Sequence, residues 1–171
     1  MIKVSLGCIA RCSITGITGT LASKVEMLTG TVQYSLQPKI KDDSPDPGKM
    51  PEATNVDYQL LEFVDAGVMD RVLIPETTHI ELGNEVECMA SGMRGVAVVK
   101  YTFINGCIYY HIQPKQSKKQ RSENVMPDRV FLPSKTLRVH GEGIAQPARA
   151  NLEKPVDQRT GGPMTPAMRI G

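Results

Sequence analysis

The chain has 171 residues, a net charge of +2, 40% hydrophobic residues and 5% aromatic residues without tryptophan. This near-neutral charge gives no compositional reason to expect binding to nucleic acid or membranes, and no apolar run is long enough for a membrane span or signal peptide. We therefore expect a cytosolic product without membrane contact. A module of about 60 residues buries only about 60% of its unfolded surface, so small modules often need partners.

An internal repeat dominates the sequence. Residues 6–39 and 82–115 align without a gap at an offset of 76 positions, and eleven of the 34 pairs are identical. The identical pairs are Leu6/Leu82, Gly7/Gly83, Cys12/Cys88, Gly16/Gly92, Gly19/Gly95, Lys24/Lys100, Gly30/Gly106, Tyr34/Tyr110, Gln37/Gln113, Pro38/Pro114 and Lys39/Lys115. The same offset continues through Met50/Met126, Pro51/Pro127 and Leu61/Leu137. One β-rich module therefore occurs twice, at 6–64 and 82–140.

Each copy predicts the same elements in the same order. A short strand ends near Cys12 or Cys88, and a turn with two glycines follows, since glycine suits positive φ. A β-rich run then enters a tight hairpin at Thr29-Gly30 or Asn105-Gly106. The third strand stops at proline, and a last strand follows a polar loop. This all-β pattern predicts two tandem small SH3-like barrels with little helix, and a three-stranded meander is the alternative.

The proposed domains are a first module at 1–67, a linker at 68–81, a second module at 82–140 and an extended C-terminal arm at 141–171. Proline disfavours helix in the linker, where a short bridging strand is an open alternative. The arm is rich in proline and glycine, so it cannot bury enough surface to order itself. We expect it to order only against its own modules or a neighbouring chain.

Residues that carry chemistry are sparse. The four cysteines, Cys8, Cys12, Cys88 and Cys107, lack metal-ligand spacing and are interpreted as small hydrophobic core residues. The three histidines are scattered, and the short GITG and GMRG turns do not form a phosphate-binding fingerprint. We therefore expect no catalytic residues, no metal and no cofactor.

Charge separates the two copies. The loop after the third strand is basic in the second copy, through Lys115, Lys118, Lys119 and Arg121. In the first copy Asp42, Asp43 and Asp46 balance the lysines of the equivalent loop, and these aspartates make it the acidic one of the two. The basic loop is interpreted either as a contact for phosphates or an acidic neighbour, or as a solvated, mobile hairpin loop. Contact between the acidic loop of one subunit and the basic loop of the next would set the register of an assembly. Further candidate contacts in the arm are Arg149, Arg159 and Arg169.

The segments TGITGTLASKVEMLTGTVQYSLQP (15–38), SGMRGVAVVKYTFINGCIYYHIQP (91–114) and TGGPMTP (160–166) resemble small tailed-bacteriophage and prophage proteins. Those proteins share a TGFxG…LNGC…QP module and a tail containing TGGP. Ile17 and Met93 depart from this pattern, since an aromatic residue is usual there, as does Leu28-Thr29 in place of Leu-Asn.

The resemblance and the repeat together favour a non-enzymatic virion structural protein, made in the host bacterial cytoplasm. It would decorate or cement the capsid, or sit at the head–tail neck. Its partners would be capsid, portal, neck or tail subunits, within a homo-oligomeric assembly. The alternative is a small nucleic-acid-binding protein using the basic loop 115–121, although no aromatic stacking residues adjoin that loop in sequence. An accessory factor that binds a host protein is a third hypothesis.

Overall fold

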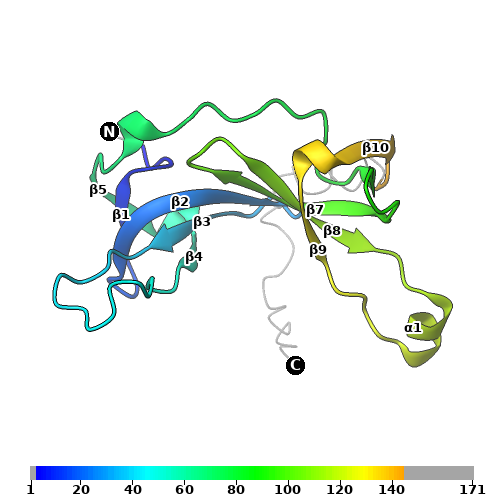
Figure 1. Cartoon of the computed structure of the whole chain (residues 1–171), viewed down its shortest axis with the longest axis horizontal. Coiled ribbons are helices and arrows are strands. Elements are labelled where there is room, and N and C mark those ends of the chain that lie inside the picture. The colour runs from blue at the N-terminus through cyan, green and yellow to red at the C-terminus, as the bar shows by residue number, and fades with distance from the viewer. Residues whose placement is uncertain (1–2, 145–171) are drawn as a thin grey trace, which may run out of the picture.

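The computed structural model describes residues 3–144, which form one open antiparallel sheet of ten strands (Figure 1). The first repeat contributes β1 (Ile9–Cys12), β2 (Thr18–Met27), β3 (Val32–Gln37), β4 (Thr54–Asp57), a 3-10 turn (Tyr58–Leu60) and β5 (Leu61–Asp65). The second contributes β6 (Glu85–Cys88), β7 (Arg94–Phe103), β8 (Ile108–Pro114), α1 (Lys118–Glu123), β9 (Val130–Pro133), a 3-10 turn (Ser134–Thr136) and β10 (Leu137–Gly141). All-β architecture is confirmed, and five strands per repeat exclude the three-stranded meander.

Both repeats pair their strands in the same way. β1 pairs with β2 and with β5, β2 pairs with β3, and β3 pairs with β4; β6 to β10 repeat this order. A bulge between Leu21 and Ser23, matched between Ala97 and Val99, shifts the side-chain alternation halfway along the long strand. Before the bulge, β2 and β7 therefore each contribute side chains to the core of their own repeat. After the bulge, the same face of each strand contributes side chains to the region where the two repeats meet.

Each repeat has its own aliphatic core. The first consists of Cys8, Ala10, Cys12, Leu21, Tyr34, Leu36, Val56 and Leu61. The second consists of Ile80, Val86, Cys88, Ala97, Ile108, Tyr110, Ile112 and Leu137. Three cysteines thus pack as small core residues, as the sequence predicted, whereas Cys107 is half-buried and belongs to neither cluster.

The repeats are fused by direct pairing of β2 with β7, at the centre of Figure 1. Val25 pairs with Tyr101, and these two residues are counterparts in the repeat. The ladder ends in two equivalent bonds: the Leu28 amide donates to the Val98 carbonyl at 2.8 Å, and the Ile104 amide to the Ala22 carbonyl at 3.1 Å. An approximate twofold axis therefore passes between Val25 and Tyr101, and we call this β2–β7 junction the seam.

The structural repeat extends slightly beyond the sequence repeat. The Val68 amide donates to the Gly7 carbonyl at 2.8 Å, and the Ile144 amide donates to the Gly83 carbonyl at 2.9 Å. Residues 141–144 therefore pack on the second module. The remainder of the proposed arm, including Arg149, Arg159 and Arg169, lies outside the described residues.

Two local elements were not predicted from the sequence. The basic loop contains the short helix α1 rather than a mobile hairpin loop alone, because Ser117 and Gln120 form a reciprocal capping box at its start. The Ser-x-x-Gln spacing signals such a cap in the sequence. The linker contains a 3-10 turn at Met69–Arg71, and no bridging strand occurs among its residues, all of which the structure describes.

The duplicated turn glycines have two different causes. Gly16 and Gly92 both have φ of +73°, as expected for a turn. Gly19 and Gly95 lie inside β2 and β7 without positive φ, so the turn explanation was wrong for them. A Cβ at Gly95 would lie 2.6 Å from the Gln113 carbonyl oxygen, and a Cβ at Gly19 would overlap the equivalent carbonyl. Glycine is needed there because two backbones approach closely.

Candidate functional site

The Gln-Pro run that ends the third strand of each repeat holds a loop in place. Gln37 donates its side-chain amide to the Pro51 carbonyl at 2.8 Å, and Gln113 does the same to the Pro127 carbonyl at 2.9 Å. The residues just before these prolines, Met50 and Met126, are 67% and 75% exposed. Both repeats therefore present an exposed methionine at the same position of a clamped loop.

The first of these loops, residues 38–53, is called the acidic loop. Its tip carries Asp42, Asp43 and Asp46, all exposed. The Asp46 carboxylate accepts the Gly48 amide at 3.2 Å, and the Ser44 hydroxyl donates to the Asp46 carbonyl at 3.2 Å. These local bonds shape the turn, while the carboxylates of Asp42 and Asp43 face solvent.

The second loop, residues 115–129, is called the basic hairpin and contains α1. Lys118, Lys119 and Arg121 are exposed on this helix, and Lys119 forms a weak ion pair with Glu123 at 4.0 Å. Lys115 lies at the base, where it pairs with Glu85 at 3.6 Å. The acidic loop and the basic hairpin occupy opposite ends of the long axis (Figure 1), so one molecule does not bring these predicted contacts together.

The structure reveals a cluster of rings that sequence reasoning missed. The aromatic patch consists of Tyr101, Phe103, Tyr109, His111 and Phe131, contributed by β7, β8 and β9. Tyr109 and Phe131 stack with ring centroids 4.9 Å apart, and Phe131 is 44% exposed. The patch adjoins the seam at Tyr101, and strands β8 and β9 run from it to the basic hairpin at the end of the molecule.

The patch belongs to the second repeat alone. Its five members correspond to Val25, Met27, Gln33, Ser35 and Asn55, none of which is aromatic. Alternating aromatic residues in YTF and YYH signal one face of a strand, but which strands lie beside each other depends on pairing. All five ring positions of the patch differ between the copies, whereas most core positions are apolar in both.

His111 lies within the patch in an apolar setting. Its Nδ1 lies 3.2 Å from the Tyr101 hydroxyl, and its ring packs edge-on against Tyr101 and Phe131. Burial, followed by the nearby Arg129 guanidinium, lowers the pKa of His111 below its ordinary 6.5. The neutral imidazole therefore dominates near pH 7, so the patch itself carries no cation there.

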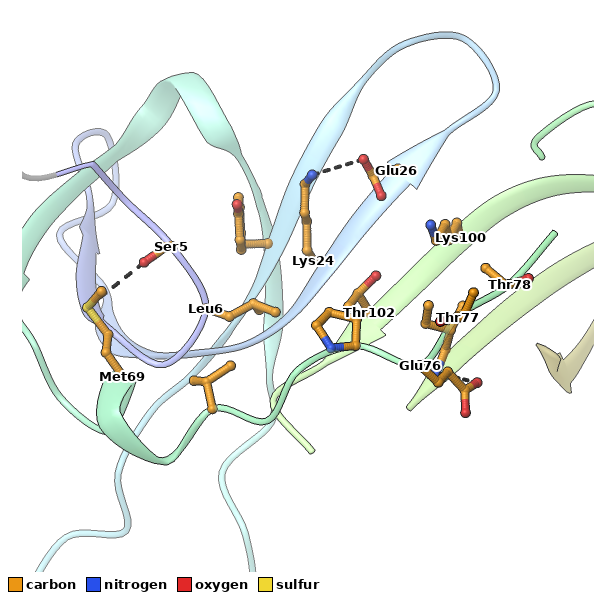
Figure 2. A pocket seen from close by; sticks show the side chains of 14 residues that line it. Ser5, Leu6, Lys24, Glu26, Met69, Glu76, Thr77, Thr78, Lys100 and Thr102 are labelled. Atoms are coloured by element: carbon orange, nitrogen blue, oxygen red, sulfur yellow. Dashed lines mark hydrogen bonds and ion pairs between the residues drawn. The ribbon is translucent and has the colours of Figure 1, made fainter. Parts of the chain in front are cut away.

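A groove of about 750 Å³, lined by both charged and apolar side chains, lies on the opposite face of the seam, between β2, β7 and the linker (Figure 2). Lys24 pairs with Glu26 at 2.9 Å, and Lys100 lies opposite Glu26 in the ladder. The duplicated lysines thus flank the approximate twofold axis. Because Glu26 lies between the two lysines, the groove has little excess charge for a free anion.

The second repeat contains an ion-pair cluster centred on Glu87, and two of its residues have counterparts of opposite charge in the first repeat. Glu87 contacts Arg138 at 3.1 Å, Arg94 at 3.2 Å and His140 at 3.6 Å. Burial opposes ionisation of Glu87, but hydrogen bonding and charge from Arg138, with the charge of Arg94, hold its pKa below the usual range. The counterparts are Arg11 paired with Glu62 in the β1–β5 ladder. The cluster links β6 with β7 and β10, and its carboxylate is occupied by these contacts.

Within residues 3–144, no group of three or more histidine, cysteine, aspartate or glutamate side chains is placed to hold a metal ion. No helix in this described range is long and apolar enough to cross a membrane. Comparison with protein-family models, curated proteins and solved structures finds no match to this chain. Functional inference therefore depends on the surfaces described above.

Proposed function

We propose that this protein is a non-enzymatic structural component of a tailed-bacteriophage virion, acting in capsid decoration or at the head–tail neck. The observation that carries the proposal is the twin display of Met50 and Met126, each exposed and each held by a glutamine clamp. Methionine is flexible and polarisable, and it is over-represented at binding surfaces that adapt to their partners. The likeness of both repeats to phage proteins supports the virion setting.

We further propose that each repeat is an SH3-like barrel. In support, the fifth strand returns to pair with the first, after a 3-10 turn that follows the fourth. Fold alone carries no function, since barrels of this type serve many roles. Fusion through the seam would give the two barrels a common framework that fixes the spacing of their loops.

Particle association tests this proposal. Virions from producing cells are purified on a density gradient, and the copy number of the protein is measured by quantitative mass spectrometry. We expect a reproducible stoichiometry, lost in the Met50→Lys/Met126→Lys variant and kept in the control Val64→Lys, whose site is 49% exposed on β5. Absence of the wild-type protein from intact particles would refute the virion assignment.

A second candidate, binding of single-stranded nucleic acid, is favoured by the aromatic patch. Bases stack on aromatic side chains at about 1–3 kcal/mol each, and a neighbouring basic groove follows the phosphates. Here β8 and β9 connect the patch to Lys118, Lys119 and Arg121. The rings of the patch and the basic side chains are therefore joined by the same two strands, which supports this second candidate.

Fluorescence anisotropy with a labelled oligonucleotide, titrated with salt, separates the two candidates. Nucleic-acid binding requires an affinity that falls as salt rises, and a further loss in Phe131→Ala. Lack of salt-dependent binding near physiological ionic strength would eliminate this second candidate while leaving the virion proposal intact.

A further inference from the structure

Linker residues 73–76 run along the β7–β8 hairpin of the second repeat. The Leu73 amide donates to the Ile104 carbonyl at 2.9 Å, and the Glu76 amide donates to the Gly106 carbonyl at 2.9 Å. An extended segment thus binds this hairpin through two of its own main-chain amides, as a peptide does when it adds to the edge of a sheet. We call this segment the linker strap.

The side chain of Glu76 completes the attachment. Its carboxylate accepts the Ile108 amide at 3.1 Å and the Ser134 hydroxyl, and it pairs with the Lys135 ammonium at 3.4 Å. The Ser134 hydrogen bond, with further donors at Ile108 and Lys135, holds the pKa of Glu76 below its usual range. The second repeat therefore holds the strap by its main chain and by one acidic side chain.

The β2–β3 hairpin of the first repeat has the same backbone as the hairpin under the strap. The Gly30 amide donates to the Met27 carbonyl at 2.9 Å, and the Gly106 amide donates to the Phe103 carbonyl at 2.9 Å. The φ angles of Gly30 and Gly106 are +90° and +81°. An extended segment would therefore meet the same arrangement of main-chain groups on either hairpin.

Among the described residues, no segment lies over the β2–β3 hairpin as the strap lies over its counterpart. A Cβ at Gly106 would lie 2.6 Å from the Ile74 carbonyl oxygen of the strap, whereas a Cβ at Gly30 would have no such neighbour within 4 Å. The carbonyls of Leu28 and Gly30, the counterparts of Ile104 and Gly106, accept no hydrogen bond from the described part of the chain. Two main-chain acceptors are thus available to donors from another molecule.

A cavity beside the β2–β3 hairpin matches the place of the Glu76 side chain. It has a volume of about 480 Å³ and is lined by residues 29–32 and 57–59. Their counterparts, residues 105–108 and 133–135, include all three that bind the Glu76 carboxylate, namely Ile108, Ser134 and Lys135. A segment bound to this hairpin would therefore place one side chain in the cavity.

The charges around this cavity differ from those in the second repeat. Lys135 is replaced by the neutral Gln59, and Pro133 is replaced by Asp57, whose carboxylate accepts the Gln33 side-chain amide at 2.8 Å. Within residues 3–144, the exposed Gln59 has no hydrogen bond or ion pair of its own. A carboxylate in the cavity would lie near Asp57 without a compensating cation, whereas a neutral carboxamide would avoid this repulsion.

We propose that the β2–β3 hairpin binds an extended segment of another polypeptide chain that carries asparagine or glutamine where the strap carries Glu76. Two main-chain amides of this segment, three positions apart, donate to the carbonyls of Leu28 and Gly30. The carboxamide oxygen accepts the amide of Val32, the counterpart of Ile108, and the carboxamide NH2 group donates to Asp57. The inference does not depend on the virion assignment, because it concerns only the groups that this hairpin presents.

Fluorescence anisotropy on the full chain tests the proposal. The probe is a labelled peptide with the sequence of residues 70–78 in which Glu76→Gln supplies the carboxamide, and the unaltered peptide is the comparison. The strap already covers the β7–β8 hairpin of the protein, so the probe reports on the first repeat. We expect the glutamine peptide to bind with a dissociation constant below about 1 mM, at least about fivefold more tightly than the glutamate peptide. Absence of saturable binding in this range would overturn the proposal.

Exchanging the charges around the cavity should reverse the preference. The variant Asp57→Asn/Gln59→Lys removes the carboxylate and supplies the lysine of the second repeat, so it should favour the glutamate peptide. The control Asp43→Asn/Ala90→Lys makes the same change in net charge at two exposed sites outside the cavity and should keep the original order. If the variant kept that order too, the assignment of the cavity would be wrong.

Two further measurements locate the bound peptide. Gly30→Asn places a side chain where the peptide backbone would lie, and it should weaken binding of the glutamine peptide at least about tenfold, with folding checked by circular dichroism. In the unmodified chain, a saturating amount of this peptide should slow hydrogen exchange of the Val32 amide about tenfold. Unchanged affinity in a folded Gly30→Asn, or unchanged exchange at Val32, would place the peptide elsewhere and refute the site. If Gly30→Asn does not fold, the charge exchange and the Val32 measurement decide.

Discussion

Val25 and Tyr101 face each other across the β2–β7 ladder, and each is the counterpart of the other in the repeat. A pair related in this way can occur only where a twofold axis crosses the sheet, as at an isologous interface between subunits. The seam thus resembles the interface of a symmetric dimer whose two halves are joined by one linker. Because the sheet is continuous, the two cores are expected to unfold together.

Weakening the seam should destabilise both repeats at once. Val25 is 1% exposed, so Val25→Ala should lower the free energy of unfolding by about 1–3 kcal/mol in urea titration. The control Val64→Ala removes the same methyl groups from a 49% exposed site and should change stability by less than about 0.5 kcal/mol. Two separate unfolding transitions in the wild-type protein would contradict coupling of the cores.

The close backbone approach at Gly19 and Gly95 predicts a steric penalty for alanine. Gly95→Ala should destabilise the protein by about 1–3 kcal/mol, because its Cβ would lie 2.6 Å from the Gln113 carbonyl oxygen. Gly48→Ala is the control, since its nearest neighbour lies 3.4 Å away and its φ is not positive. Thermal unfolding followed by circular dichroism distinguishes them, and equal midpoints would disprove the crowding argument.

The glutamine clamps are expected to order the methionine loops. Gln37→Ala removes side-chain bonds to the carbonyls of Pro51 and Pro38, and Gln113→Ala removes those to Pro127 and Pro114. Loss of the shorter bond alone should cost about 0.5–1.5 kcal/mol in either variant. Hydrogen exchange should accelerate mainly in the loop that follows the altered residue. Gln59→Ala, at an exposed position for which no hydrogen bond is found among the described residues, is the control. Faster exchange throughout the sheet would instead indicate global destabilisation.

The buried setting of His111 predicts sensitivity to acid. Its pKa is lowered below 6.5 in the folded protein, so the unfolded chain binds a proton at higher pH than the native protein does. The associated stability is present above about pH 6.5 and is lost as the pH falls below that value. Urea titrations at pH 7 and pH 5 should show a smaller loss of stability in His111→Gln than in wild type. An equal loss would show that His111 does not contribute to the pH dependence.

Local chemistry explains which parts of the fold were predictable. Asn105-Gly106, the prolines that end the third strands and the positive-φ glycines act within a few residues, so they predict turns and strand ends correctly. The capping box at Ser117 is equally local and could have predicted α1. The close approach at Gly19 was misinterpreted because its partner, Gln37, comes from another strand.

The candidate surfaces were predictable only in part. Exposure of Asp42 and Lys118 follows from charge alone, since ionised side chains resist burial. The clustering of Tyr101 with Phe131 required the β7–β8–β9 register, which joins residues thirty positions apart. Likewise, the duplication of Gln37 and Gln113 was visible in the sequence. That each side chain binds the carbonyl of a proline in the following loop became clear only from the structure.

By itself, the sequence determined that one β-rich module occurs twice, where its strands turn, and which loops differ in charge, because each depends on residue type and spacing along the chain. Only the tertiary structure decided that the two modules share a sheet, with Val25 against Tyr101 on an approximate twofold axis. It alone also decided that five rings gather on one repeat and that linker residues 73–76 run along the β7–β8 hairpin. These features depend on which edge of a long strand pairs with which distant neighbour, and a single sequence does not specify that choice.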